Sequence, residues 1–327
     1  MVIARELTRA LREAGHDAHI IVTPQNRFGH QASAYLATWL TDLSSSEGRA
    51  IDQVISLRYP SYAIRHRRHV CWLNHTMREY YDLWDAFSAT LGRKGRIKER
   101  VRKTFIHAAD RYLLTHLSRL FVQSRTVQQR MATWQAVNST VLYPPAPLRD
   151  YRCEGYGPKF LFVSRLTRLK RAELLVRALA TPPANAVSLV MAGDGEEREP
   201  LERLATELGV NSRITFSGRL TEDQLIGELA TCRAVCFPPF QEDYGFVTVE
   251  AFASRKAVIT CRDSGGPAEL VRDGVNGVVC EPTPDALGRA MRRLSDDTGL
   301  AERMGTAAFD AGARLTWPET VRQLVLQ

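Results

Sequence analysis

Two glutamates with seven residues between them are the first candidates for chemistry. Glu242 lies in a polar loop after an apolar run, and Glu250 lies inside a helix predicted to begin at Phe246. Gly245, just before that helix, allows the backbone to turn. The N–H groups at a helix start bind anions, whereas carboxylates repel phosphate and accept hydrogen bonds from hydroxyl groups. This stretch therefore predicts a ligand that carries both phosphate and sugar hydroxyl groups.

Two basic residues form the second candidate group. Arg165 and Lys170 follow the apolar run 160–164, in the loop before an amphipathic helix. An arginine binds a diphosphate through two parallel hydrogen bonds, and a lysine acts as a mobile point charge. We expect these two cations to neutralise a diphosphate, and we expect the neighbouring Arg168 and Arg171 to be solvated.

Two glycine-containing segments also bear on the ligand. In DSGGPAELV (263–271), two glycines allow the backbone to approach a ligand closely. In VMAGDGEEREPL (190–201), Gly193 and Gly195 are similar to a dinucleotide-binding fingerprint, but Arg198 occupies the place of its third glycine. No GxxxxGK[ST] run is present. We therefore expect neither NAD binding nor a P-loop.

The elements that must position these residues alternate regularly from Lys159 onward. Helix-like segments separate short apolar runs at 160–164, 187–193, 214–218, 234–239, 257–261 and 277–281. Such alternation predicts a doubly wound parallel sheet covered by helices. Ligands bind beyond the carboxyl ends of the strands of such sheets. The loops with Arg165, Lys170 and Glu242 begin there.

The first half of the chain predicts a second α/β unit. Its expected strands are 20–23, 54–57, 69–73, 120–124 and 140–145, with a basic helical stretch at about 82–118. The predicted fold class is α/β, with two Rossmann-like doubly wound domains facing across a cleft. The expected parts are a first domain (1–145), a Pro- and Gly-rich linker (146–158), a second domain (159–300) and C-terminal helices that return to the first domain (301–327).

Charge and cysteine usage limit the partners and the compartment. Residues 1–150 hold 22 basic and 12 acidic side chains, whereas the remainder holds 22 and 24, so we expect an anionic partner for the first half. The densest basic run, 92–103, is compatible with a solvated helix face or with docking on anionic lipid. No nucleic-acid motif accompanies it. The cysteines form no CxxC pair, and no signal peptide or membrane-spanning run is recognisable. We expect a cytoplasmic protein with reduced cysteines.

The motifs within 159–282 resemble those of the retaining glycosyltransferases of family 4. EDYGFVTVE (242–250) matches the E-x7-E motif of this family, and SRLTRLK (164–170) is similar to its G-R-L-x-x-x-K segment, with Ser164 in place of the glycine. SGGPAELV (264–271) resembles the block that follows. The resemblance implies the GT-B fold, in which the second domain binds a nucleotide-sugar donor and the first domain binds the acceptor.

The resemblance also implies roles for single positions. Arg165 and Lys170 would bind the donor diphosphate. Glu250 would bind the ribose, and Glu242 the transferred sugar. The remaining expected donor contacts are the backbone at Gly245, Phe246 and Val247, and the base-lining residues Gly218, Arg219 and Leu220.

On the acceptor side, WLNHTMREYYDL (72–83) is similar to a subgroup of this family. His75 would then lie at the reacting sugar, and Arg78, Tyr81 and Asp82 would shape the acceptor site. The implied activity is the retaining transfer of a hexose from GDP-mannose or a UDP-sugar to a glycan, lipid-linked or small-molecule acceptor. We expect no metal or other cofactor, because fixed cations and a helix start would balance the diphosphate charge. The expected location is cytoplasmic, with peripheral contact at the inner face of the membrane.

Two alternatives remain open at this point. One is a sugar-nucleotide epimerase of GT-B fold, and the other is a catalytically impaired binding or scaffold protein. The second alternative arises from residues 1–24, which predict a helix followed by a strand at 19–22. In members of this family, these two elements come after a first strand and a Gly-rich turn. We expect the first strand and Gly-rich turn to be missing, a truncation of roughly 20 residues on the usual scale of strands and turns.

Overall fold

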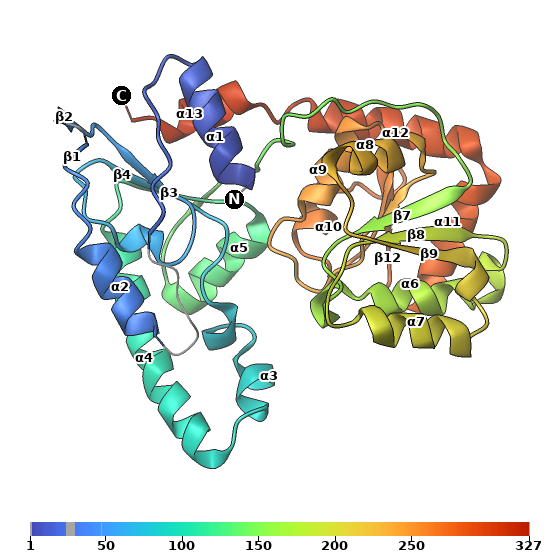
Figure 1. The fold of residues 1–327 in the computed structure, drawn as a ribbon, viewed down its shortest axis with the longest axis horizontal. Coiled ribbons are helices and arrows are strands. Elements are labelled where there is room, and N and C mark those ends of the chain that lie inside the picture. Colours follow the sequence, from blue (N-terminus) through green and yellow to red (C-terminus); the bar gives the residue numbers. More distant parts are fainter. Residues whose placement is uncertain (1, 24–29, 47, 327) are drawn as a thin grey trace. The chain divides into compact units, whose positions relative to one another are not determined.

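The computed structural model describes residues 2–23, 30–46 and 48–326. The chain divides into two compact units: Met1–Pro144 together with Trp317–Gln327, and Pro145–Thr316 (Figure 1). Both units are α/β and are built on parallel sheets. The C-terminal segment is divided between them, since α12 (Thr298–Gly312) belongs to the second unit and α13 (Trp317–Leu324) to the first.

A six-stranded parallel sheet forms the centre of the second unit, in the order β12-β11-β10-β7-β8-β9. Its strands are β7 (Lys159–Val163), β8 (Ser188–Ala192), β9 (Ile214–Gly218), β10 (Val235–Cys236), β11 (Val258–Cys261) and β12 (Gly277–Cys280). The chain winds from β7 to β9 and then returns past β7 to β10. This is a doubly wound sheet whose winding reverses between β7 and β10, and each strand overlaps a predicted apolar run.

Helices cover this sheet because its strands are apolar on both faces. Among them, α6 packs against α7 and α11, and α9 packs against α12 (Figure 1). The helices of this unit besides α12 are α6 (Ala172–Leu179), α7 (Arg198–Glu207), α8 (Glu222–Thr231), α9 (Phe246–Ala253), α10 (Gly266–Leu270) and α11 (Pro284–Asp296).

The segment expected as a linker packs on the second unit. The Glu154 N–H donates to the Ala230 carbonyl at 2.9 Å. The fully buried ammonium of Lys256 donates to the Gly155 carbonyl and lies 4.2 Å from the centroid of the Tyr156 ring. These contacts fix the segment to the helices and loops beside the sheet.

The first unit contains a four-stranded parallel sheet: β3 (Val54–Ser56), β4 (His69–Leu73), β5 (Arg119–Val122) and β6 (Thr140–Val141). Every residue of β4 is buried, and its side chains alternate between two cores. Val70 and Trp72 contact the core of α1 (Val2–Glu13) and α13, whereas Cys71 and Leu73 lie in the core that includes α4 (Arg93–Thr115). The Trp72 and Trp317 rings meet edge to face, with centroids 6.3 Å apart, so α13 completes this unit.

Shorter elements surround this sheet. They are α2 (Gln31–Trp39), α3 (Trp84–Ala89), α5 (Arg125–Arg130), the 3-10 turns Ser61–Ala63 and Arg78–Tyr80, a π-helical turn Met131–Gln135 and the short antiparallel pair β1 (Ser45–Ser46) and β2 (Arg49–Ala50). The predicted basic helical stretch is confirmed as α3 and α4, which Gly92 and its neighbours separate.

The predicted strand at 20–23 is wrong. Ile20, Ile21 and Val22 form no strand, and their exposed fractions are 40%, 49% and 65%. A strand needs a neighbour that pairs with its N–H and C=O groups, and no described residue pairs with this run. An apolar pattern predicts a strand only when a pairing partner is also present.

Candidate functional site

The loops that leave the carboxyl ends of β7, β8 and β9 are joined by backbone hydrogen bonds. The Leu166 N–H donates to the Asp194 carbonyl at 3.0 Å, and the Gly193 N–H donates to the Gly218 carbonyl at 2.7 Å. Gly193 has a φ of +134°, and a Cβ there would lie 1.8 Å from the Ser164 carbonyl oxygen. The glycine is therefore required for loop packing, which explains the partial likeness to a dinucleotide fingerprint.

A cavity of about 280 Å³ opens among these loops. It is lined by Val163, Ser164, Arg165, Ala192, Gly193, Asp194, Arg219, Leu220 and Leu225. Arg165 is exposed, and within the described part of the chain its guanidinium makes no hydrogen bond or ion pair. The structure thus brings Arg165 together with Arg219 and Leu220, two residues expected to line the base.

Lys170 and Glu242 form an ion pair at the same edge of the sheet. Their side chains are 17% and 19% exposed. The loop of Glu242 is fixed by its backbone, because its N–H donates to the Ser264 carbonyl and its carbonyl accepts from the Gly266 N–H, both at 2.9 Å. The side chains expected to bind the diphosphate and the sugar are therefore in direct contact.

The helix start expected to face the ligand is present. Gly245, with a φ of +79°, immediately precedes α9, which begins at Phe246. A Cβ on Gly245 would lie 2.7 Å from Phe237 Cε1 and 2.9 Å from Pro267 Cγ, so no larger residue fits without movement. In the first turn of α9 the Thr248 N–H donates to the Gly245 carbonyl at 2.9 Å, whereas the N–H groups of Phe246 and Val247 have no acceptor within the helix. They lie just after the loop of Glu242.

Glu250, on α9, is 7% exposed. Arg149 Nη1 donates to Glu250 Oε1, and the Tyr151 hydroxyl donates to the same oxygen at 3.4 Å. Burial raises the pKa of Glu250, although the adjacent Arg149 lowers it. Arg149 Nε also lies 3.1 Å from a carboxylate oxygen of Glu222. Because both contacts use Oε1, Glu250 Oε2 is left for a further donor within the described residues.

Sequence reasoning missed Arg149 and Tyr151, which lie in the Pro- and Gly-rich segment. Their partner Glu250 is about a hundred residues further along the chain. No local spacing links residues that are so far apart in sequence. Only the packing of this segment on the second unit brings them to the carboxylate.

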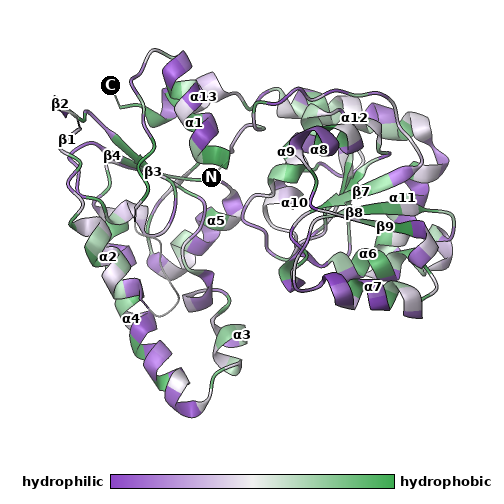
Figure 2. Cartoon of the chain, in the orientation of Figure 1, coloured by the Kyte–Doolittle hydropathy of each residue, from purple (hydrophilic) through white to green (hydrophobic). Residues whose placement is uncertain are grey.

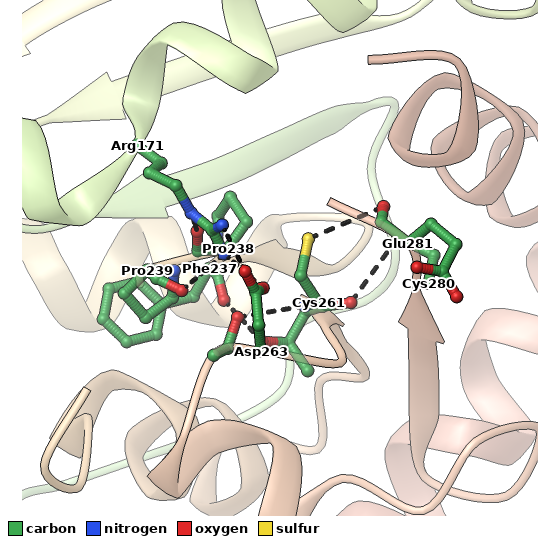
Figure 3. A network of polar contacts seen from close by, with 10 residues as sticks. Arg171, Phe237, Pro238, Pro239, Cys261, Asp263, Cys280 and Glu281 are labelled. Atoms are coloured by element: carbon green, nitrogen blue, oxygen red, sulfur yellow. Dashed lines mark hydrogen bonds and ion pairs between the residues drawn. The ribbon is translucent and has the colours of Figure 1, made fainter. Parts of the chain in front are cut away.

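The prediction that Arg171 is solvated is wrong. Its guanidinium donates to the Pro238 and Pro239 carbonyls at 2.8 and 2.7 Å and pairs with both carboxylate oxygens of Asp263 at 2.7 Å (Figure 3). Arg171 therefore ties the loop after β10, which carries Glu242, to the loop after β11. Two of its partners are backbone carbonyls, for which a sequence gives no signal.

Within the first unit, His75 lies two residues after the end of β4, and its Nδ1 is 2.8 Å from the Thr76 carbonyl oxygen. Arg78 pairs with Asp82 at 2.7 Å, and Arg130 joins the same carboxylate at 3.3 Å. The structure brings Arg78 and Asp82 together in one ion-pair group.

Tyr81 lies in a buried cluster that sequence reasoning did not anticipate. This residue is 2% exposed, and its hydroxyl donates to Asp110 at 2.7 Å. The hydroxyls of Tyr35 and Tyr62 donate to the same carboxylate. Burial raises the pKa of Asp110 to about 6, and the three hydroxyl groups oppose this effect. In this conformation Tyr81 can position neighbouring groups but is not exposed to a ligand.

Comparison with known proteins finds a family match over most of the second unit. The family described as Glycosyl transferases group 1 matches residues 152–311. The matched residues make up just under half of the chain. The matched region contains Arg165, Lys170, Glu242 and Glu250, together with the residues that line the cavity.

The curated relatives of this chain include glycosyltransferases. An uncharacterized glycosyltransferase of Methanocaldococcus jannaschii is 32% identical over 168 residues, which cover 50% of this chain and 43% of the relative. The alpha-D-kanosaminyltransferase of Streptomyces kanamyceticus is 32% identical over 163 residues, which cover 47% and 42%. The matched parts thus span less than half the length of these relatives.

Solved structures confirm the α/β GT-B fold that was predicted. Sucrose-phosphate synthase from Thermosynechococcus elongatus matches with a TM-score of 0.77 and 18% identity, over 98% of this chain and 90% of that chain. The Anabaena protein HepE, in complex with UDP and glucose, matches with a TM-score of 0.59 and 22% identity, over 67% and 65%. The chain shares the α/β GT-B fold, with two Rossmann-like units.

Proposed function

We propose that the chain is a retaining glycosyltransferase of family 4, which transfers a hexose from GDP-mannose or a UDP-sugar to a hydroxyl group of a glycan, lipid-linked or small-molecule acceptor. The observation that carries this proposal is the grouping at one edge of the second sheet. Arg165 lines a cavity there, Lys170 contacts Glu242, and Glu250 is oriented through one oxygen. Cations and hydroxyl-binding carboxylates together suit a ligand with both a diphosphate and a sugar.

The contact between Lys170 and Glu242 suggests how the donor is received. A nucleotide sugar carries its diphosphate directly beside the transferred sugar. In the free protein the ammonium and the carboxylate satisfy each other. On binding, the diphosphate would take over Lys170 and a sugar hydroxyl would take over Glu242. The base would occupy the cavity beside Arg219 and Leu220.

The proposed chemistry is a front-face transfer. The bond between the anomeric carbon and the phosphate oxygen breaks while the acceptor oxygen bonds to the same face of the carbon, so the configuration is retained. The leaving phosphate oxygen takes the acceptor proton. Arg165, Lys170 and the start of α9 stabilise the charge that develops on the diphosphate.

Glu242 serves here as a hydrogen-bonding group and not as the nucleophile of a retaining hydrolase. We assign His75, Arg78 and Asp82 to the acceptor side, with Tyr81 as a positioning residue, and we propose no metal or other cofactor. A cytoplasmic location would keep the free cysteines reduced.

The test is a panel of nucleotide sugars screened for protection against thermal unfolding, because a ligand that binds only the folded state stabilises it. Each nucleotide sugar that protects is then incubated with and without acceptors. Glycosylated product with release of a nucleoside diphosphate supports the proposal. An isomerised nucleotide sugar formed without acceptor would indicate an epimerase, and protection without any turnover would indicate a binding protein.

A further inference from the structure

The solvent-facing side of α4 is apolar along one narrow line. Ile97, Val101, Phe105 and Tyr112 are 67%, 69%, 47% and 54% exposed. Their spacing of four, four and seven residues places them on the same side of a helix. We call these four residues the α4 stripe. Figure 2 shows apolar and polar positions alternating along the helix.

The α4 stripe is not part of the core. The opposite side of α4 contains the core-facing residues, such as Ile106 and Leu114, which are buried. A helix that only covers a sheet is apolar on one side, whereas α4 is apolar on two. Since these exposed side chains do not contribute to the core, the stability of the fold does not explain why they are apolar.

Basic residues border the α4 stripe. Lys94, Lys98, Arg100 and Arg111 are exposed and flank it on the helix surface. The two acidic residues of α4, Glu99 and Asp110, are buried: Glu99 pairs with Arg102 and accepts from the Tyr80 hydroxyl, and Asp110 accepts from tyrosine hydroxyls. The exposed side of α4 therefore carries positive charge and apolar surface without negative charge.

The neighbouring helix extends the apolar surface. Tyr35 of α2 meets Phe105 edge to face at 6.1 Å between ring centroids, and Trp39 meets Tyr112 at 6.4 Å. Leu36 and Leu40, on α2 and directly after it, are 58% and 63% exposed. Two adjacent helices thus present apolar side chains to solvent.

We propose that α4 is a docking surface for an anionic lipid bilayer. Such a surface offers anionic headgroups to the flanking lysines and arginines, and the boundary of the acyl chains to the α4 stripe. A nucleic acid would bind the basic residues through its phosphates, but it would offer no apolar surface for Ile97 and Val101. A second copy of this chain would place two positively charged helices against each other. Among the described residues, no helix has the length and apolarity to cross a bilayer. The proposed contact therefore places α4 on the bilayer surface.

The proposal goes beyond glycosyl transfer and does not depend on it. Its test is co-sedimentation of the full chain with vesicles of phosphatidylcholine mixed with phosphatidylglycerol, and with vesicles of phosphatidylcholine alone. The wild-type chain should sediment with the mixed vesicles and not with the neutral ones. Absence of binding to the mixed vesicles would overturn the proposal.

The apolar contribution is tested by the double variant Ile97→Ser/Val101→Ser. Both side chains are about two-thirds exposed and make no aromatic contact, so the fold should be kept, as thermal unfolding would verify. We expect about a tenfold or greater loss of vesicle binding, since binding scales with the apolar area inserted. Val22→Ser/Val275→Ser, at exposed aliphatic residues elsewhere, is the matched control and should bind as wild type. Unchanged binding of the α4 variant would overturn the proposal.

The charge contribution is tested by the triple variant Lys94→Gln/Lys98→Gln/Arg100→Gln. Each basic residue near an anionic surface contributes roughly a fivefold factor, so the loss should be on the order of 100-fold. Arg203→Gln/Arg303→Gln, on the second unit, is the control and should bind as wild type.

Two further measurements separate the other occupants. If duplex DNA bound as tightly as the mixed vesicles and the Ile97→Ser/Val101→Ser variant kept that binding, a nucleic-acid surface would replace the lipid surface. If sedimentation velocity showed a dimer that this variant abolishes, a second copy would be the partner. Either result would overturn the proposal.

Discussion

Replacing Glu250 with glutamine tests the assignment of this carboxylate to the ribose. Arg149 Nη1 and the Tyr151 hydroxyl both donate to Oε1. In the Glu250→Gln variant, the amide oxygen would face these donors and the NH₂ group would take the place of Oε2. A ribose hydroxyl would then meet a donor instead of an acceptor. Arg149 would keep the exposed Glu222 as a partner, so no buried charge would be stranded.

The size of the effect follows from the type of hydrogen bond that is lost. A bond from a hydroxyl group to a charged acceptor is worth about 1.5–3 kcal/mol, which is roughly a 10- to 150-fold change in affinity. Glu250 is buried, and a low dielectric strengthens such bonds. The variant should therefore bind the cognate nucleoside diphosphate about 10- to 150-fold more weakly than wild type.

The assay is calorimetric titration of both proteins with the nucleoside diphosphate and with its dideoxyribose analogue. Wild type should bind the analogue more weakly than the nucleoside diphosphate by a similar factor. The Glu250→Gln variant should bind the two ligands with affinities that differ by less than about threefold, because in this variant the ribose hydroxyl groups have no carboxylate acceptor to lose. Glu222→Gln is the control and should discriminate as wild type does. Equal discrimination by wild type and the Glu250 variant would refute the assignment.

Three further predictions concern positioning, pH and metal dependence. Arg171→Lys should lose two or three hydrogen bonds, about 2–3 kcal/mol, and should weaken nucleotide binding. The control is Arg213→Lys, which removes similar hydrogen bonds to the Ala184 and Leu179 carbonyls at the opposite end of the strands. It should lower the stability of the protein but leave nucleotide binding unchanged. An equal loss of nucleotide binding in both variants would contradict the role of Arg171 in positioning the site. Since burial raises the pKa of Asp110 from its ordinary value of 3.8 to about 6, its contribution to stability is full below pH 3.8 and falls as pH rises through 6. The unfolding free energy of wild type relative to Asp110→Asn, measured in urea, should therefore fall by about 2–2.5 kcal/mol between pH 4 and pH 7, and a constant difference would count against the raised pKa. Finally, EDTA should leave transferase activity unchanged, and a loss that Mg²⁺ restores would disprove the metal-free mechanism.

The strands of the second unit could be predicted because each is a short apolar run between helix-like segments. The start of α9 at Phe246 followed from Gly245 and the polar loop before it. These features are local, and the sequence pattern alone determines them. The exposed run at 20–23 could not be assigned correctly, because a strand also depends on a partner elsewhere in the chain.

The candidate site could be predicted only in part, for a similar reason. Arg165, Lys170, Glu242 and Glu250 follow from residue type and position relative to the strands. The roles of other residues, such as Arg149 and Arg171, depend on partners distant in sequence or on backbone carbonyls. The cluster around Asp110 also joins residues from separate elements.

The most direct test of the central claim compares turnover with donor binding in the variant Arg165→Gln/Lys170→Gln. If these cations stabilise the charge that develops on the leaving diphosphate, turnover should fall by about a thousandfold or more, because charge stabilisation acts mainly in the transition state. The dissociation constant of the donor should change far less, by about tenfold. Turnover equal to that of wild type would contradict the proposed glycosyl transfer at this site.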